Sequence, residues 1–166
     1  MILVLLGTQN NDFHRLLDEI QKNIDNGTIN DEVIVQAGFT KYKSDKMKIF
    51  NMIPKENLET LVKQADLVIT HAGLGSIEMS LEQGKKVIAV PRLKRYGEHV
   101  NDHQKDIESE FDKDGFIIGI DDVKDLNNAI IKSKKFTPKK YEKREEGEIV
   151  NIIKTFIDKI WHLWYN

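Results

Sequence analysis

The stretch Ala65-Asp66-Leu67-Val68-Ile69-Thr70-His71-Ala72-Gly73-Leu74-Gly75-Ser76 decides the fold of this chain. Its first half is a short apolar run, which is typical of a strand that is buried on both faces. Two glycines then follow at alternate positions, and residues 76–82 have helical character. A buried strand that turns through glycines into a helix is the repeating unit of parallel α/β folds. The stretch therefore predicts a strand–turn–helix unit.

The rest of the chain repeats this pattern on both sides. With residues 66–70, the apolar runs 2–6, 33–35, 48–52, 86–90 and 116–120 are predicted strands. Between and after them, helices are predicted at 13–24, 54–64, 76–82, 100–111 and 121–132. This alternation predicts an α/β fold, a doubly wound, Rossmann-like parallel sheet of about six strands within residues 1–133.

The bulk composition is that of an ordinary globular domain. The chain has 166 residues, 40% hydrophobic and 31% charged, enough to bury one core. A net charge of -2 gives no general attraction to nucleic acid. Cysteine is absent, which removes disulfides and thiolate metal sites and suits a cytoplasmic location. The apolar residues before Gly7 are too few for a signal peptide or a membrane span.

The end of the chain has a different character. Residues 134–146 are almost entirely polar and predict a linker, or the polar start of the next helix. Residues 147–166 predict an amphipathic helix, whose apolar stripe runs from Ile149 to Trp164 with a 3.6-residue period. The stripe suits packing on the chain's own sheet or on a partner. Direct lipid contact is less favoured, because the polar face is not strongly basic.

The glycine loop is the main candidate for ligand binding. Gly73 and Gly75 allow a phosphate to approach the backbone, and the N–H groups of a helix start carry partial positive charge. Ser76 can cap the helix or donate to the same phosphate. The alternative is a tight turn that needs glycine for geometry alone. Gly7-Thr8-Gln9, after the first strand, offers a second close approach. The chain has neither GxGxxG nor GxxxxGK[ST], so NAD and P-loop chemistry are not expected.

The segment after the fifth predicted strand is rich in polar side chains. Asn101, His103 and Gln104 are candidates to hydrogen-bond a sugar or a phosphate. The cations Arg92, Lys94 and Arg95 are candidates for a diphosphate, although taken singly a solvated helix start explains them better. His99 and His103 have the i, i+4 spacing of metal ligands, but no third ligand accompanies them, so no metal site is predicted.

Together these segments resemble the C-terminal, donor-binding domain of glycosyltransferase family 28. The strings that carry the resemblance are Gly7-Thr8-Gln9, residues 65–76, Gly84-Lys85-Lys86-Val87-Ile88-Ala89-Val90-Pro91-Arg92 and Tyr96-Gly97-Glu98-His99-Val100-Asn101-Asp102-His103-Gln104. The chain is most similar to single-domain members that are donor-binding subunits of two-part enzymes. Such subunits act in dolichol-linked and in bacterial capsule or exopolysaccharide synthesis.

The resemblance implies the C-terminal half of a GT-B fold and a set of site residues. It places the donor diphosphate at Gly7, Thr8, Gly73, Gly75 and Ser76. It places uracil at the backbone of Met52 and Ile53, and the sugar at Asn101, His103 and Gln104. Family members commonly carry an acidic residue for the ribose six positions after Gly73. Here that position is Met79 and the glutamate is Glu78, rotated by about 100° on a helix.

The resemblance also implies a reaction. A hexose or N-acetylhexosamine passes from a UDP-sugar to a lipid-linked acceptor, with inversion and with no metal or other cofactor. A membrane-anchored partner brings the acceptor, so the chain is expected in the cytoplasm at the inner face of the membrane. His71 is a candidate contributor to catalysis, although a histidine at a strand end is more often structural. The alternatives are a non-catalytic UDP-sugar-binding accessory subunit and a fragment of a nucleotide-sugar epimerase.

Overall fold

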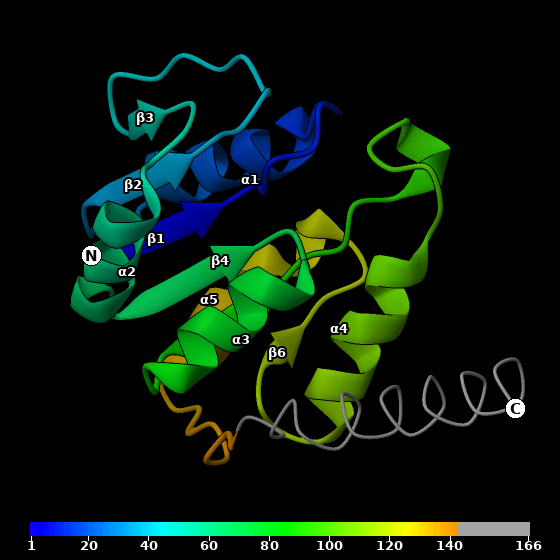
Figure 1. Cartoon of the computed structure of the whole chain (residues 1–166). Helices are drawn as coiled ribbons and strands as arrows, with labels where there is room; N and C mark the ends of the chain where they lie inside the picture. The colour runs from blue at the N-terminus through cyan, green and yellow to red at the C-terminus, as the bar shows by residue number, and fades with distance from the viewer. Residues whose placement is uncertain (143–166) are drawn as a thin grey trace, which may run out of the picture.

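The computed structural model describes residues 1–142, which form one parallel β-sheet with helices on both faces (Figure 1). The six strands lie in the order β3-β2-β1-β4-β5-β6, and every neighbouring pair is parallel. They are β1 (Ile2–Leu5), β2 (Val33–Gln36), β3 (Lys48–Phe50), β4 (Leu67–Thr70), β5 (Lys86–Ala89) and β6 (Ile118–Gly119). This is a doubly wound order, so the predicted fold class is confirmed.

The helices of the described residues connect these strands. They are α1 (His14–Asp25), α2 (Lys55–Gln64), α3 (Leu74–Glu82), α4 (His103–Lys113) and α5 (Leu126–Ser133), with the short 3-10 helices η1 (Lys94–Tyr96) and η2 (Val123–Asp125). Helix α1 contacts α5, and α2 contacts α3. These two pairs cover opposite faces of the sheet, while α4 contacts the edge strand β6.

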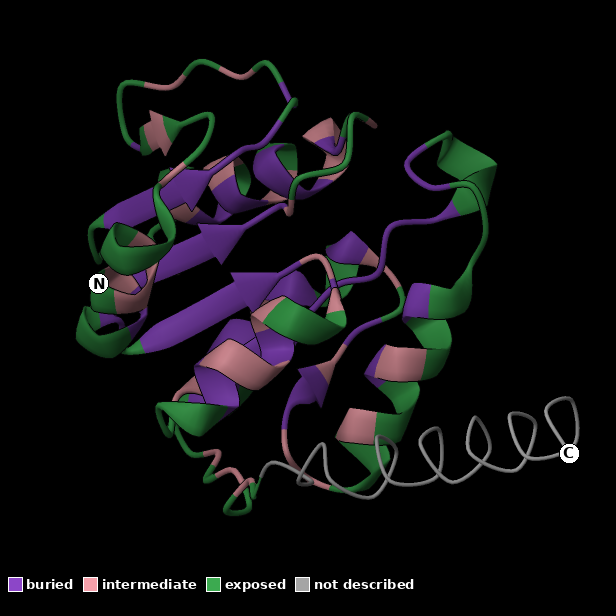
Figure 2. Cartoon of the chain, in the orientation of Figure 1, coloured by how far each residue is buried: buried purple, intermediate pink, exposed green. Residues whose placement is uncertain are grey.

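Strand β1 shows why the sheet is buried on both faces. Ile2 and Val4 belong to the apolar cluster under α1 and α5, whereas Leu3 and Leu5 belong to the cluster under α2 and α3. All four side chains are buried, as are the central strands in general (Figure 2). Burying each large apolar side chain stabilises the fold by about 1.5–3 kcal/mol. The continuous apolar run seen in the sequence is therefore what a central parallel strand needs.

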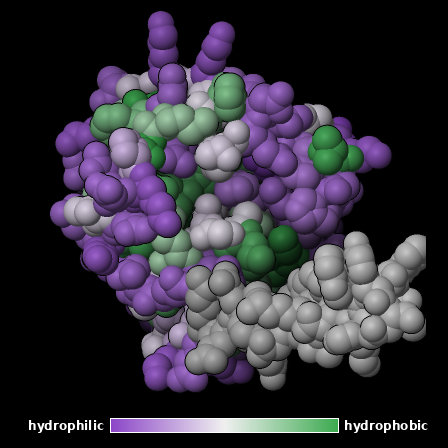
Figure 3. All heavy atoms as spheres, viewed as in Figure 1, coloured by the Kyte–Doolittle hydropathy of each residue, from purple (hydrophilic) through white to green (hydrophobic). Residues whose placement is uncertain are grey.

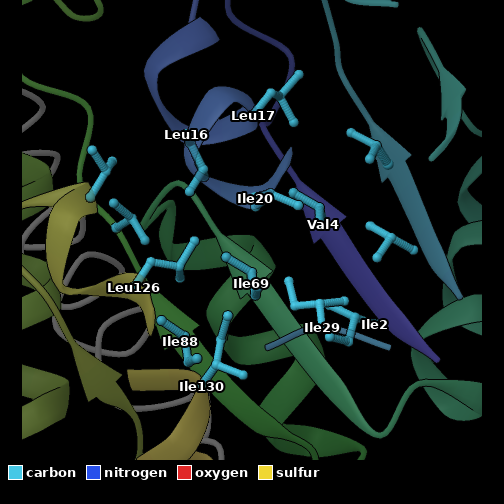
Figure 4. Packing of buried hydrophobic residues seen from close by; sticks show 14 of the residues in the cluster. Ile2, Val4, Leu16, Leu17, Ile20, Ile29, Ile69, Ile88, Leu126 and Ile130 are labelled. Atoms are coloured by element: carbon cyan, nitrogen blue, oxygen red, sulfur yellow. The ribbon is translucent and has the colours of Figure 1, made fainter. Parts of the chain in front are cut away.

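The larger cluster joins both helices of one face to the middle of the sheet. Helices α1 and α5 direct apolar side chains toward β1, β4 and β5 (Figure 4). The contributing side chains include Leu16, Leu17, Ile20, Leu126, Ile130, Val4, Ile69 and Ile88. Because the cluster spans the sheet order from β1 to β5, it fixes the relative position of the strands whose ends carry the candidate site.

The strand order reverses between β1 and β4. From β1 the chain winds outward through β2 to β3, and then returns to β4 on the other side of β1. Leu5 and Thr70 are register partners at the carboxyl ends of the two strands. In open parallel sheets, ligands bind in the crevice outside the strand ends at such a reversal. The segments that begin at Gly7 and at His71 therefore meet where a ligand is expected.

The helix starts on both sides of this point differ from those predicted. Helix α3 begins at Leu74, with Gly73 as its N-cap, so Ser76 lies in the first turn and is not the cap. Helix α4 begins only at His103, because η1 and a left-handed Gly97 occupy the preceding segment. The predicted strands over 48–52 and 116–120 are both shorter in the structure.

The segment after α5 is attached to the fold as far as it is described. Phe136 packs against the larger apolar cluster, and the Lys139 N–H donates to the Gly115 carbonyl at 3.1 Å. The Tyr141 hydroxyl donates to Glu78 at 2.6 Å. Residues 134–142 thus contact the domain at three points. The remainder of the predicted linker and the predicted helix 147–166 lie outside the described residues.

Candidate functional site

A hollow of about 310 Å³ lies at the carboxyl ends of β1 and β4, and we call it the switch-point hollow. Its lining comes from the turn after β1, the end of β2, the start of α3 and the segment that leads into α4. The lining residues are Gly7, Thr8, Gln9, Gln36, His71, Gly73, Leu74, Gly75, Ser76, His99, His103 and Gln104. The hollow thus gathers the predicted diphosphate residues, His71 and two of the three predicted sugar residues.

The imidazole ring of His71 explains two of the glycines. A Cβ atom added to Gly73 would lie 2.2 Å from His71 Nε2, and one added to Gly7 would lie 2.6 Å from the same atom. Both distances are far shorter than a van der Waals contact, so a side chain at either position would displace the ring. Gly7 also has a φ of 76°, in the region that favours glycine. Local geometry alone therefore accounts for Gly7 and Gly73.

Gly75 has no such explanation. A Cβ atom added there would meet nothing within 4 Å, and its φ is not positive. Glycine in a helix costs about 0.5–1 kcal/mol relative to alanine. Neither packing nor backbone conformation within the described residues requires glycine at this position. The missing side chain leaves space in the hollow beside the first N–H groups of α3, which have no partner within the helix.

Ala72 holds an unusual backbone conformation between these residues. Its φ is 61°, and the residue is fully buried. A non-glycine residue in the left-handed region costs about 1–2 kcal/mol. Such strain persists where the surrounding structure imposes it, and it concentrates at functional sites. Here the strained residue turns the chain sharply from the end of β4 into α3.

His71 is neutral and holds a fixed orientation. Its Nδ1 lies 3.1 Å from the Leu5 carbonyl oxygen, which can only accept, so Nδ1 carries the proton and Nε2 is bare. The pKa of His71 is lowered to about 4, mainly by burial. The hydrogen bond to Leu5 raises this pKa, and the neighbouring Arg92 and His99 lower it. At neutral pH the ring therefore brings no positive charge to the hollow. It offers a hydrogen-bond acceptor instead.

Arg92 is an internal brace and does not line the hollow. It is fully buried, and its guanidinium donates to the carbonyls of Leu6 at 2.6 Å, Asn11 at 2.7 Å and Glu98 at 3.2 Å. The suggestion that Arg92 meets a diphosphate is therefore wrong, because the side chain is fully buried and both of its terminal nitrogens donate to backbone oxygens. Lys94 and Arg95 lie exposed on η1 and are not among the lining residues either.

The segment before α4 is held by a buried ion pair. Glu98 accepts from Arg15 Nε at 2.8 Å and from Arg15 Nη2 at 2.9 Å, and it also accepts the Leu93 N–H at 2.9 Å. Such bidentate geometry is more specific than a single contact. Arg15 comes from α1, so this pair attaches the segment to the other side of the switch point.

The predicted sugar residues occupy different positions. His103 lines the hollow, and its Nδ1 is hydrogen-bonded to the Asn101 side chain. Asn101 is exposed and does not line the hollow, so in this structure it orients His103. Gln104 lines the hollow but is buried, and its Oε1 accepts the Arg92 N–H at 3.0 Å. Only the amide nitrogen of Gln104 is left for a ligand.

The predicted nucleoside residues Met52 and Ile53 line a separate groove of about 350 Å³, which we call the β3 groove. Its other lining residues are Phe50, Pro54, Asn57, Thr60 and Leu61. Met52 is 47% exposed, and apolar side chains interrupt the hydrophilic surface in this region (Figure 3). The Ile53 N–H already donates to Gln36 Oε1 at 3.2 Å. Because Gln36 also lines the switch-point hollow, it joins the two sites.

Glu78 faces away from both sites. It accepts the Tyr141 hydroxyl and lines a third groove with Leu74, Glu110, Phe111, Asp114, Phe116, Tyr141 and Glu142, which we call the aromatic–acidic groove. The assignment of Glu78 to the nucleoside is therefore not supported, since the side chain points one helical face away from the hollow. Met79 packs against the apolar cluster on its face of the sheet.

Sequence reasoning named Gln9 only as part of the turn after the first strand, missed Gln36 and Leu74 as site residues, and weighed His99 only as a metal ligand. Gln36 is a polar residue, 6% exposed, at the carboxyl end of a buried strand. The rule that ligands bind at such strand ends was a sufficient signal for it. His99 and Leu74 carried no comparable signal, because their approach to the hollow depends on the path of the chain into α4 and on the true start of α3.

Within residues 1–142, no group of three or more His, Cys, Asp or Glu side chains is placed to hold a metal ion. None of the helices in that part of the chain is long and apolar enough to cross a membrane.

The fold is that of the C-terminal half of a GT-B glycosyltransferase. The family model of the glycosyltransferase family 28 C-terminal domain matches residues 1–156. The chain belongs to this family, as the resemblance in its motifs predicted.

The curated relatives carry the name of a transferase subunit. The UDP-N-acetylglucosamine transferase subunit ALG13 of Mus musculus is 40% identical over 63 residues, which are 38% of this chain and 5% of that protein. The subunit of the same name from Debaryomyces hansenii is 30% identical over 100 residues, 60% of this chain and 44% of that protein. The chain therefore spans less than half the length of these relatives.

Solved structures share the fold at low sequence identity. The glycotransferase of kitacinnamycin superposes with a TM-score of 0.60 at 18% identity, over 80% of this chain and 34% of that chain. The UDP-GlcNAc 2-epimerase from Methanocaldococcus jannaschii superposes with a TM-score of 0.56 at 16% identity, over 93% of this chain and 45% of that chain. In each case the matched part is less than half of the larger protein.

Proposed function

We propose that this chain is the donor-binding catalytic subunit of a glycosyltransferase that takes a hexose or N-acetylhexosamine from a UDP-sugar. The observation that carries the proposal is Gly75, a glycine that nothing within the described residues requires and that leaves the backbone of α3 open to the hollow. Family membership supports glycosyl transfer. The names of the relatives, UDP-N-acetylglucosamine transferase subunits, support UDP as the nucleotide.

The proposed reaction is a direct displacement with inversion. The acceptor hydroxyl attacks the anomeric carbon, the bond from that carbon to the diphosphate oxygen breaks, and UDP leaves with the electron pair. The first N–H groups of α3 and the Ser76 hydroxyl stabilise the negative charge on the leaving diphosphate. Oxygen-seeking metals bind through carboxylates, and no described lining residue of the hollow is Asp or Glu. This supports the proposal that the transfer needs no metal ion.

The general base is proposed to come from outside this chain. A pKa of about 4 makes His71 a weak base at neutral pH, although its bare Nε2 can accept a hydrogen bond from a hydroxyl. We assign the base to a membrane-anchored partner that also holds the lipid-linked acceptor. The chain would then act at the inner, cytoplasmic face of the membrane. The predicted stripe from Ile149 to Trp164 is the proposed contact with that partner.

The open space at Gly75 also supports a second function, a non-catalytic accessory subunit that binds UDP-sugar. The described lining of the hollow offers hydrogen-bond donors and neutral imidazole but no carboxylate to act as a base. Co-expression with a candidate membrane partner separates the two functions. Transfer from UDP-glucose, UDP-galactose or UDP-N-acetylglucosamine that is lost with Gly75→Asp in this chain supports a catalytic subunit. Transfer that persists with Gly75→Asp contradicts it.

Donor binding itself is tested by NMR titration of the isolated chain with UDP and the three UDP-sugars. We expect shifts for Gly7, Gly73, Gly75 and Ser76 in the wild type and none in Gly75→Asp, whose carboxylate occupies the phosphate position. Gln83→Asp adds the same charge at the far end of α3 and is expected to bind normally. A wild-type chain that shows no shift at millimolar ligand contradicts the proposed site.

A further inference from the structure

His99 is a buried polar residue at the edge of the switch-point hollow. It is 5% exposed and is one of the lining residues. Its Nδ1 accepts the Asn101 N–H at 3.2 Å, and its ring meets the ring of His103 edge to face, with centroids 4.7 Å apart. Because Nδ1 is an acceptor, the proton of the neutral ring must lie on Nε2. The tautomer of His99 is therefore fixed by the backbone of the segment that leads into α4.

The Nε2–H of His99 has no hydrogen-bond partner among residues 1–142. The atom is not one of the fully buried side-chain atoms that lack a partner, so it keeps contact with solvent, and the residue lines the hollow. Nothing in the packing of the described chain uses this N–H. A ligand in the hollow would use it.

His71 presents the opposite group to the same hollow. Its Nδ1–H is taken by the Leu5 carbonyl, which leaves Nε2 bare, whereas His99 keeps its Nε2–H. The two rings are close enough for His99 to lower the pKa of His71. One histidine therefore offers an acceptor and the other a donor. Of the parts of a nucleotide sugar, the ionised phosphate oxygens can only accept, so they match His99 and not His71.

The position of His99 is fixed before any ligand binds. Its neighbour Glu98 is held by Arg15 and by the Leu93 N–H, and the Arg92 guanidinium donates to the Glu98 carbonyl. None of the described residues that line the hollow is Lys or Arg, so neutral donors must hold an anion there. A donor that is already oriented loses little freedom when it binds, which favours affinity.

We propose that His99 is a positioning residue whose Nε2–H donates a hydrogen bond to the diphosphate of the donor, and this rests on the proposed function. The hydrogen bond is charge-assisted, because its acceptor is an ionised phosphate oxygen. It holds the diphosphate against the start of α3. The uridine part of the donor lies beyond its reach, toward the β3 groove.

The test compares UDP with uridine on three forms of the chain. In NMR titrations, we expect His99→Phe to weaken UDP binding about 10-fold or more and to leave uridine binding unchanged. His99→Gln keeps an N–H at similar reach, so we expect it to restore most of the affinity for UDP. In the wild type, the Nε2–H resonance of His99 should shift with UDP and not with uridine. That signal tests the contact even where a variant folds poorly.

The possible failures are distinct. A wild-type chain that binds neither ligand overturns the proposed function together with the role of His99. If the wild type binds UDP, three results overturn the role of His99 alone. They are unchanged UDP affinity in His99→Phe, equal loss of UDP and uridine binding, and a His99→Gln variant no better than His99→Phe.

Discussion

The ring of His71 and the two glycines beside it form one packing unit. The ring occupies the space that a side chain on Gly73 or Gly7 would need, and the hydrogen bond to Leu5 keeps it there. The left-handed Ala72 between His71 and Gly73 adds backbone strain to the same few residues. Their identities are therefore interdependent, and the energetic cost of changing one depends on its neighbour.

We expect Gly73→Ala to destabilise the fold by about 1–3 kcal/mol, since its methyl group would lie 2.2 Å from His71 Nε2. In a His71→Ala background the same change should cost less than about 1 kcal/mol, because the ring is gone. Urea unfolding of the wild type, both single variants and the double variant measures this coupling. Equal costs of Gly73→Ala in the two backgrounds would show that the ring does not exclude the methyl group.

Gly75 should respond in the opposite way. Gly75→Ala fills open space in the first turn of α3, so we expect it to stabilise the fold by about 0.5–1 kcal/mol. The same methyl group stands where a phosphate would approach, so affinity for UDP should fall. Thermal unfolding of Gly75→Ala measures its stability, and titration with UDP measures its affinity. A variant that is more stable and binds UDP normally would remove the argument from Gly75.

At the scale of the element, helix α4 carries His103 and Gln104 at its start and a buried carboxyl one turn later. Glu108 is 6% exposed and its carboxyl lies directly over Gly119 of β6, where any Cβ atom would collide with it. Burial, together with the charges of Asp121 and Asp112, raises the pKa of Glu108 to about 7, against the lowering effect of Lys105. The folded chain thus favours the protonated form of Glu108 more than the unfolded chain does.

The sign of the pH effect follows from this raised pKa. Stability falls as pH rises from about 4.5, the ordinary value for glutamate, to about 7, where Glu108 loses its proton in the folded chain. Glu108→Gln removes that loss, so it should be more stable than the wild type by about 1–3 kcal/mol at pH 8 and about equal at pH 5. Urea unfolding at pH 5 and at pH 8 measures this difference in stability. The exposed Glu110→Gln on the same helix should show no such difference, and a pH-independent effect of Glu108→Gln would contradict the assignment.

The sequence alone predicts the strands of this structure better than it predicts the starts of the helices. The apolar runs predicted the strands and their parallel order, because a strand buried on both faces leaves a continuous signal. Helix starts were less predictable. The start of α3 at Leu74 follows the left-handed Ala72. The late start of α4 depends on Gly97 and on the buried contacts of Glu98, which join residues distant in sequence. For the same reason the roles of Arg92 and His99 could not be read from their neighbours in the chain.

Arg92 connects the two parts of the molecule that lie on either side of the strand-order reversal between β1 and β4. Its guanidinium contacts the segment after β1 through Leu6 and Asn11, and the segment before α4 through Glu98. Both segments border the switch-point hollow. One buried side chain thus sets the separation of the two sides of the candidate site.

We expect Arg92→Met to destabilise the fold by about 3–5 kcal/mol, because the carbonyls of Leu6 and Asn11 lose a charged donor and Glu98 loses a nearby cation. Hydrogen exchange should accelerate at the amides that follow β1 more than in α2, which lies away from the brace. The surface variant Arg95→Met is the control and should change neither quantity by more than about 0.5 kcal/mol. Uniform acceleration across the sheet would show that Arg92 contributes only general stability.

The hydrogen bond from Tyr141 to Glu78 has a consequence for how an acceptor reaches the donor. It fixes the end of the described chain to α3, and Leu74 at the start of that helix lines both the switch-point hollow and the aromatic–acidic groove that contains Tyr141. The described chain thus ends at Glu142, in a groove that shares Leu74 with the hollow. If the proposed partner binds this chain beyond Glu142, the acceptor that it carries is tethered to the hollow, and a short tether gives an effective concentration of about millimolar. Lengthening the chain after Glu142 should then lower this effective concentration and leave the hollow itself unchanged.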